Sequence, residues 1–205
     1  MSEGPAAVAK AKGLGWALWV VALLGVAAVI YIIAQASIKP GAASGLKPLA
    51  RGEMAKLSFP EEAGAAPVNT FLDSTGKPLR VADFRGKVLV LNLWATWCAP
   101  CVTEMPTLAR LAKSFEGRNV VVVPVSVDSP SAQDKARAFI GQHAPLQYYA
   151  DPQMKLPFAL KPPAAGMPTT IIYGADGVER ARLSGGADWS GADARAVVEQ
   201  VLREP

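Results

Sequence analysis

The sequence predicts an α/β domain behind an apolar N-terminal segment, and three observations support this prediction. Residues 87–94 form an almost unbroken apolar run, which is typical of a strand buried on both faces of a sheet. Cys98 and Cys101, the only cysteines in 205 residues, follow this run at the start of a helical pattern. Residues 13–38 contain no charged side chain. The chain is long enough for one domain and an additional segment.

The N-terminal part is expected to consist of a tail over residues 1–12, a transmembrane anchor over 13–38 and a linker over 39–60. About 20 apolar residues suffice to cross a bilayer. A cleaved signal peptide is the alternative, and Ala34–Ala36 resembles a cleavage site, but the apolar run exceeds the usual length of about 7–15 residues. Proline and glycine interrupt any periodic pattern in the linker. The folded domain is expected over residues 61–205.

The positive charge of the chain belongs to this N-terminal part. Residues 1–60 contain six basic and two acidic side chains, whereas residues 61–205 contain 15 of each. A basic face for nucleic acid is therefore not indicated, and basic residues on both sides of a membrane span explain the charge. Since both sides are basic, the charges do not fix the orientation of the span.

Within the folded domain, strands and helices alternate. Short strands are expected at 68–72, 79–81 and 147–150, and a short helix at 154–160. Two buried strands, 87–94 and 119–127, are separated by a helix over 98–114. Ser129 and Pro130 begin a further helix. Strands at 169–173 and 178–183 enclose a hairpin turn, and an amphipathic helix over 194–202 ends the domain.

The cysteine pair has the spacing of a redox motif at a junction of strand and helix. Cys98 falls at the helix N-terminus, where unpaired N–H groups and the helix dipole stabilise a thiolate. Its pKa is therefore expected below the usual value of about 8.5. Cys101 lies one turn later on the buried side, so Cys98 is the candidate nucleophile and Cys101 the resolving thiol. The alternatives are a permanent disulfide or part of a zinc site, although structural zinc takes four ligands and the chain has one histidine.

The segment from Leu93 to Cys101 resembles the active site of thioredoxin-fold proteins, and its continuation to Pro106 resembles the TlpA-like and ResA-like branch. This branch contains membrane-anchored thiol–disulfide interchange proteins of the bacterial envelope. The resemblance covers about residues 65–205 and includes the segments 83–87 and 166–170. It implies a thioredoxin fold, which is a central mixed β-sheet flanked by helices, with residues 128–150 as a helix–strand insertion.

The resemblance also implies roles for three further residues. Pro168 matches the cis-proline that lies beside the cysteines, with an ordinary trans proline as the alternative. Trp97 is the neighbour of the nucleophile. Asn92 stands where thioredoxin has a buried aspartate, and an amide cannot accept a proton. Glu104, one helical turn after Cys101, is therefore the candidate proton acceptor, and a solvated surface glutamate is the alternative.

The expected function is that of a periplasmic thiol–disulfide oxidoreductase, anchored by one membrane span in the bacterial inner membrane. We expect a reductase of disulfide-containing envelope proteins in the maturation of cytochrome c or of copper sites in respiratory oxidases. Its partners would be these substrates, a membrane electron donor and the bilayer around residues 13–38, with no nucleic acid. No metal and no cofactor other than the Cys98–Cys101 disulfide is expected. A general thiol oxidase or isomerase, a thiol peroxidase and a copper-carrying module are the alternatives.

Overall fold

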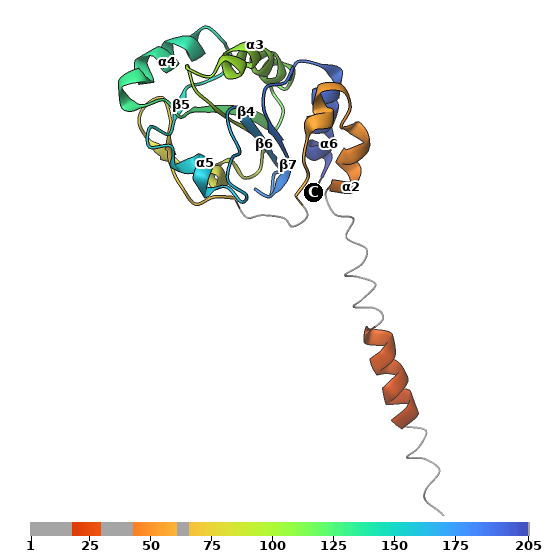
Figure 1. The fold of residues 1–205 in the computed structure, drawn as a ribbon. Helices are drawn as coiled ribbons and strands as arrows, with labels where there is room; N and C mark the ends of the chain where they lie inside the picture. The colour runs from red at the N-terminus through yellow and green to blue at the C-terminus, as the bar shows by residue number, and fades with distance from the viewer. Residues whose placement is uncertain (1–17, 30–42, 61–65, 205) are drawn as a thin grey trace, which may run out of the picture. The chain divides into compact units, whose positions relative to one another are not determined.

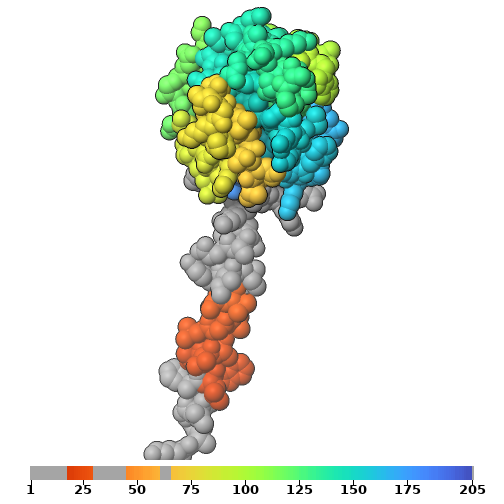
Figure 2. All heavy atoms as spheres, turned by 90° about the vertical axis from the view of Figure 1, so that its left-hand side faces the viewer, coloured from red at the N-terminus to blue at the C-terminus, as the bar shows by residue number. Residues whose placement is uncertain are grey.

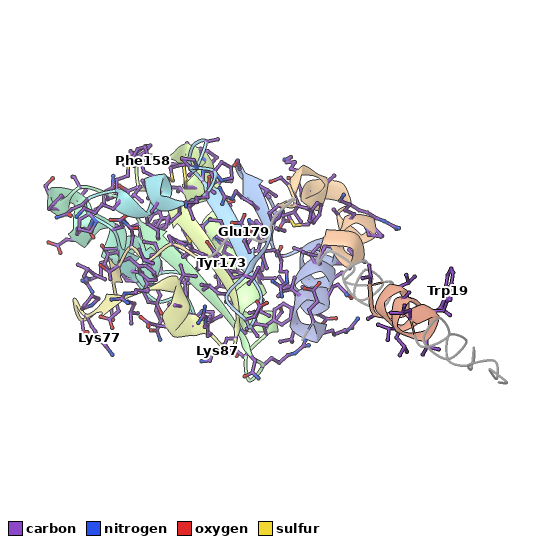
Figure 3. The ribbon with its side chains drawn as sticks, turned by 90° about the horizontal axis from the view of Figure 1, so that it is seen from below. Trp19, Lys77, Lys87, Phe158, Tyr173 and Glu179 are labelled. Atoms are coloured by element: carbon purple, nitrogen blue, oxygen red, sulfur yellow. A yellow bond between two sulfur atoms is a disulfide. The ribbon has the colours of Figure 1, made fainter. Side chains whose placement is uncertain are left out.

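The computed structural model describes residues 18–29, 43–60 and 66–204. The chain divides into two compact units between Gly41 and Ala42. In the first unit, residues 18–29 are helical, their side chains are exposed, and Trp19 projects from the helix (Figure 3). Among the described residues, no helix has both the length and the apolar character that a membrane span requires. The predicted tail over 1–12 and both ends of the predicted anchor over 13–38 lie outside the described residues.

A seven-stranded mixed sheet forms the centre of the second unit (Figure 1), and this confirms the predicted central mixed β-sheet. The strand order is β2-β1-β5-β4-β3-β6-β7. The interior strand β3 pairs parallel with β4 and antiparallel with β6. The strands are β1 (Phe71–Leu72), β2 (Pro78–Leu79), β3 (Val88–Trp94), β4 (Val120–Ser126), β5 (Tyr149–Ala150), β6 (Thr169–Tyr173) and β7 (Glu179–Ser184).

Helices cover both faces of this sheet, which explains why β3 is buried along its whole length and is apolar except at Asn92. Val88, Val90 and Trp94 point to the face that packs against α3, α4 and α6. The alternate residues Leu89, Leu91 and Leu93 point to the other face, where Leu156 of α5 packs. The helices are α3 (Ala99–Ser114), α4 (Gln133–Gly141), α5 (Lys155–Ala159) and α6 (Ala192–Arg203), and 3₁₀ turns occur at η3 (Val81–Phe84) and η4 (Pro130–Ala132).

The predicted helix–strand insertion is present, because η4, α4 and β5 follow β4 in order. Strand β5 pairs with β1, so the hairpin of β1 and β2 lies beside the insertion on the molecular surface (Figure 2). The hairpin strands are shorter than expected: β1 contains two residues, and Val68, which was predicted to belong to it, is exposed.

Residues 43–60 differ from the expected linker, because they form part of the second unit. They contain α2 (Ala43–Leu46), η1 (Lys47–Leu49) and η2 (Gly52–Lys56), and the side chains of Leu46 and Met54 are fully buried. The Ser58 N–H donates to the Arg182 carbonyl at 2.7 Å, and the Arg182 N–H donates back at 2.9 Å. Buried apolar side chains and a covered β7 edge hold this segment on the domain. The folded domain therefore begins before residue 61.

Candidate active site

Cys98 occupies the N-cap position of α3 and is joined to Cys101 by a disulfide bond. The Cys101 N–H donates to Cys98 Sγ at 3.3 Å, so the helix N-terminus is directed at this sulfur. Cys98 is 6% exposed and Cys101 is fully buried. Only Cys98 therefore reaches the surface, as an attacking thiol must.

A short turn carries the chain from β3 to this position. Strand β3 ends at Trp94, and the Cys98 N–H donates to the Ala95 carbonyl at 3.2 Å. Trp97 precedes Cys98 in this turn, and its side chain is 64% exposed. Pro100 stands in the first turn of α3, where its missing N–H removes no helical hydrogen bond. The candidate nucleophile Cys98 thus lies beside an exposed indole after the end of a buried strand.

Pro168 lies at the same end of the sheet. Its peptide bond with Met167 is cis, as the resemblance implied. Thr169, the next residue, pairs with Leu93 near the end of β3. The Pro168 carbonyl accepts a hydrogen bond from the Gly185 N–H at 2.8 Å. Gly186 lies against Pro100, because a Cβ at Gly186 would be 3.3 Å from Pro100 Cβ. The loop after β7 thus connects Pro168 with the cysteine helix.

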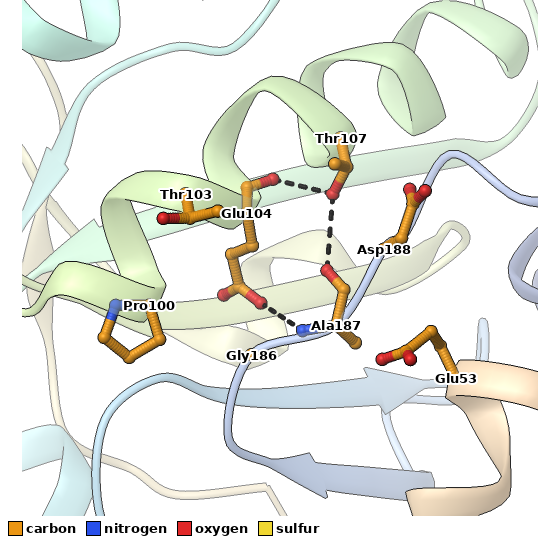
Figure 4. A pocket seen from close by; sticks show the side chains of 8 residues that line it. All are labelled: Glu53, Pro100, Thr103, Glu104, Thr107, Gly186, Ala187 and Asp188. Carbon is orange, nitrogen blue, oxygen red and sulfur yellow. Dashed lines mark hydrogen bonds between the residues drawn. The ribbon is translucent and has the colours of Figure 1, made fainter.

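Glu104 is 2% exposed, which excludes the solvated glutamate that was the alternative to a functional role. One carboxylate oxygen accepts from Asn92 Nδ2 at 2.8 Å. The other accepts from the Ala187 N–H at 3.2 Å, a bond that Figure 4 shows. Burial raises the pKa of Glu104 to about 7, because desolvation of the carboxylate outweighs the stabilising hydrogen bonds. This side chain can therefore exchange a proton near neutral pH.

A cavity of about 510 Å³ opens beside the first turns of α3 (Figure 4). Glu104 and the dipeptide residue Pro100 form part of its wall, and the loop after β7 forms the opposite side. Glu53 comes from the segment expected to be a linker, where no pattern in the sequence marks a site residue. Ala187 contributes a backbone N–H, for which a sequence carries no signal. The lining residues are Glu53, Pro100, Thr103, Glu104, Thr107, Gly186, Ala187 and Asp188.

Comparison with known proteins places this arrangement in a family. Residues 63–181, more than half of the chain, match the model of the AhpC/TSA family. The chain belongs to the AhpC/TSA family. Within it, the chain is similar to the thiol-disulfide oxidoreductase ResA of Bacillus subtilis (strain 168), with 32% identity over 117 residues. The ResA of Geobacillus thermodenitrificans (strain NG80-2) is 29% identical over 121 residues. These matches confirm the predicted resemblance.

The matched region is 57% of this chain and 63% of the Bacillus subtilis ResA, so the chain spans less than two thirds of that relative. The chain is also similar to the solved structure of a putative thiol:disulfide interchange protein DsbE from Chlorobium tepidum. It is 25% identical with a TM-score of 0.58, covering 71% of this chain and 97% of the other. The chain shares its fold with a secreted thiol-disulfide isomerase from Corynebacterium glutamicum, which is 24% identical with a TM-score of 0.62. This match covers 73% of this chain and 93% of the isomerase.

Proposed function

We propose that this chain is a thiol–disulfide oxidoreductase in which Cys98 attacks and Cys101 resolves. The observation that carries the proposal is the pair itself, with Cys98 capping α3 at the surface and Cys101 buried one turn later. The names of the ResA relatives support the same chemistry. A helix N-terminus stabilises the thiolate of its capping cysteine, and a thiolate is the nucleophile of disulfide exchange.

In the reducing direction, the Cys98 thiolate attacks one sulfur of a substrate disulfide. A mixed disulfide forms, and the other substrate sulfur leaves as a thiolate. Cys101 then loses its proton and attacks Cys98 Sγ, which forms the Cys98–Cys101 disulfide and releases the second substrate thiolate. Two electrons pass to the substrate, and a reductant must restore the dithiol before the next cycle.

Glu104 is proposed to accept the proton that Cys101 loses in the resolving step. It lies three residues after Cys101 on α3, is buried, and has a pKa of about 7. A group with a pKa near the operating pH is best suited to proton transfer. The Asn92 amide and the Ala187 N–H orient its carboxylate from two different elements. Trp97 and the Pro168 segment would contact the substrate chain next to Cys98.

The reductase direction, rather than the oxidase direction, is proposed from the dipeptide between the cysteines. A strong oxidant needs its reduced form strongly stabilised, as when the thiolate pKa falls to about 3.5. Ala99 and Pro100 carry no charged or hydrogen-bonding side chain that could add to the effect of the helix. A moderate pKa corresponds to a more reducing couple. Labelling of thiols in acid-quenched cells should therefore find the pair mainly as a dithiol, and a mainly oxidised pair would favour an oxidase.

The proposed setting is the periplasm, with the chain anchored through residues 13–38 and reduced by a membrane electron donor. The resemblance to the TlpA-like and ResA-like branch supports it, as does the uncharged span. The proposed substrates are oxidised cysteine pairs of envelope proteins, namely apocytochrome c or the copper-site proteins of respiratory oxidases. If the C-terminal domain is exported, a reporter enzyme that is active only outside the cytoplasm should be active when it is fused to the C-terminus. A reporter active in the cytoplasm would contradict this topology.

Trapping tests the mechanism directly. Cys101→Ser removes the resolving thiol, so this variant should accumulate mixed disulfides between Cys98 and its substrates, and mass spectrometry would identify them. The matched control is Cys98→Ser, which leaves only the buried thiol and should capture no partner. Equal capture by both variants would contradict the assigned roles.

A further inference from the structure

The chain that follows β4 lies beside the turn that leads to Cys98. Strands β3 and β4 are parallel with Trp94 opposite Ser126, and the Val127 N–H donates to the Trp94 carbonyl at 2.9 Å. The residues that leave both strands therefore run side by side. Asp128 belongs to this second segment, and its side chain is fully buried.

The Asp128 carboxylate holds Thr96 by two groups at once. The Thr96 N–H lies 3.0 and 3.2 Å from its two oxygens, and Thr96 Oγ1 donates to one of them at 2.8 Å. Ser126 Oγ donates to the other at 2.9 Å. Among the ion pairs of the described residues, none includes Asp128. These donors therefore compensate the burial of the carboxylate, and two of the three belong to the turn before Cys98.

Residues of the helix–strand insertion hold the backbone of Asp128. Gln133 at the start of α4 donates from Nε2 to the Asp128 carbonyl. The Tyr148 hydroxyl in turn donates to Gln133 Oε1, and the Arg137 guanidinium lies 4.5 Å from the centre of the Tyr148 ring. The backbone of Asp128 is thus fixed by α4 and by the segment before β5.

We propose that Asp128 is a positioning residue for the attacking thiol and acts through Thr96. Thr96 is the second residue of the turn that closes when the Cys98 N–H donates to the Ala95 carbonyl. Fixing both the N–H and the hydroxyl of Thr96 selects one geometry for this turn. That geometry sets where Trp97 and Cys98 stand relative to an incoming disulfide. The inference rests on the proposed function, in which Cys98 is the nucleophile.

The effect of Asp128 on reactivity should be one of placement, separate from thiol ionisation. A misplacement of a reacting group by about 1 Å can cost about 100-fold in rate. Asp128→Asn keeps the shape of the side chain but replaces one acceptor oxygen with a donor. Thr96→Val keeps the N–H and removes the hydroxyl. Thr96→Ser retains both donors, and Ser131→Ala is the matched control on the exposed η4 turn.

The experiment measures the attack of the reduced full-length chain on oxidised glutathione as a function of pH. The rate at the alkaline plateau, where Cys98 is fully ionised, should fall about 10-fold or more in Asp128→Asn and in Thr96→Val. Thr96→Ser should restore it to within about twofold, and Ser131→Ala should match the wild type. The double variant that combines Asp128→Asn with Thr96→Val should react no more slowly than the slower of the two single variants, because both changes remove the same interaction.

Plateau rates equal to the wild type in folded Thr96→Val would overturn the proposal, as would losses that multiply in the double variant. If Asp128→Asn does not fold, the pair Thr96→Val and Thr96→Ser decides the outcome alone. The proposed function is tested separately, since the unmodified chain must react through Cys98 in the same assay. A wild-type chain that does not react with oxidised glutathione would contradict the proposed oxidoreductase function. A wild-type chain that reacts, together with variants that have the same plateau rate, would contradict only the role of Asp128.

Discussion

Glu104 and Asp128 are both buried carboxylates near the cysteine pair, but the structure holds them in different ways. Glu104 lies on α3 beside the cavity and accepts one hydrogen bond from an amide side chain and one from a backbone N–H. Asp128 lies after β4 and accepts from the backbone and hydroxyl of Thr96 and from the Ser126 hydroxyl. Their exposed fractions, 2% and 0%, hardly differ. Burial alone therefore does not decide what a buried carboxylate does.

The partners of each group make the difference. Glu104 connects α3, β3 and the loop after β7, and its pKa is raised to about 7, so it can change its protonation state in the neutral range. The Asp128 carboxylate accepts from three donors, and two of them belong to Thr96 in the turn before Cys98. A carboxylate with two donors beside a cavity suits proton transfer, whereas one that fixes a turn suits positioning.

The largest expected effect concerns stability. Asp128→Ala removes the acceptor of three buried or half-buried donors, each of which costs about 1–3 kcal/mol when left unpaired. We expect a loss of about 4 kcal/mol in the free energy of unfolding, measured by urea denaturation at pH 7. Glu104→Gln keeps the shape of the side chain and has no charge to desolvate, so it should not lower the free energy of unfolding under the same conditions. Equal losses in the free energy of unfolding in the two variants would show that both carboxylates contribute to stability to the same extent.

The pH dependence of stability should separate the carboxylates next. The pKa of Glu104 rises from its ordinary value of 4.5 to about 7 on folding, so between these values the folded state binds a proton that the unfolded state has lost. Stability must then fall as pH rises from about 4.5 to about 7, by about 3 kcal/mol in total, and remain lower above that range. The difference between wild type and Glu104→Gln isolates this contribution. A difference that is constant with pH would contradict the raised pKa.

Kinetics should divide the reaction into two steps with different sensitivities. Glu104→Gln cannot accept a proton, so release of the mixed disulfide by Cys101 should slow by up to about 100-fold. The first attack by Cys98 should change little. Rapid-mixing experiments on a substrate with a fluorescent label would resolve both steps across pH 6–9, around the usual thiol pKa. Unchanged release over this range would assign Glu104 to the fold only.

The cysteine pair and the main strands of the sheet could be predicted from the sequence because the patterns that indicate them are local. The apolar run of β3, the Cys98–Cys101 spacing and the helical periodicity of α3 each lie within one continuous segment. The docking of residues 43–60 could not be predicted in the same way. Short 3₁₀ turns have no long periodicity, and this segment contacts α6, which lies far along the chain. Asp128 was visible only as one residue in a loop. Its partner Thr96 is 32 residues away, and only the parallel register of β3 and β4 brings them together.

The smallest expected effect tests how Asn92 tunes Glu104. Its amide donates to Glu104 at 2.8 Å and to Thr170 Oγ1 at 2.9 Å, and the first of these bonds lowers the pKa of Glu104. A hydrogen bond to a charged group contributes about 1.5–3 kcal/mol, so Asn92→Leu should raise that pKa by about 1–2. Titration of the Glu104 carboxyl by infrared difference spectroscopy, with Glu104→Gln to assign the band, measures the change. Glu53→Gln is the matched control at the rim of the same cavity, because Glu53 makes no hydrogen bond to Glu104 and its exposed ion pair with Lys56 spans 2.8 Å. An equal rise in both variants would mean that the general environment of the cavity, rather than the Asn92 amide, sets the protonation of Glu104.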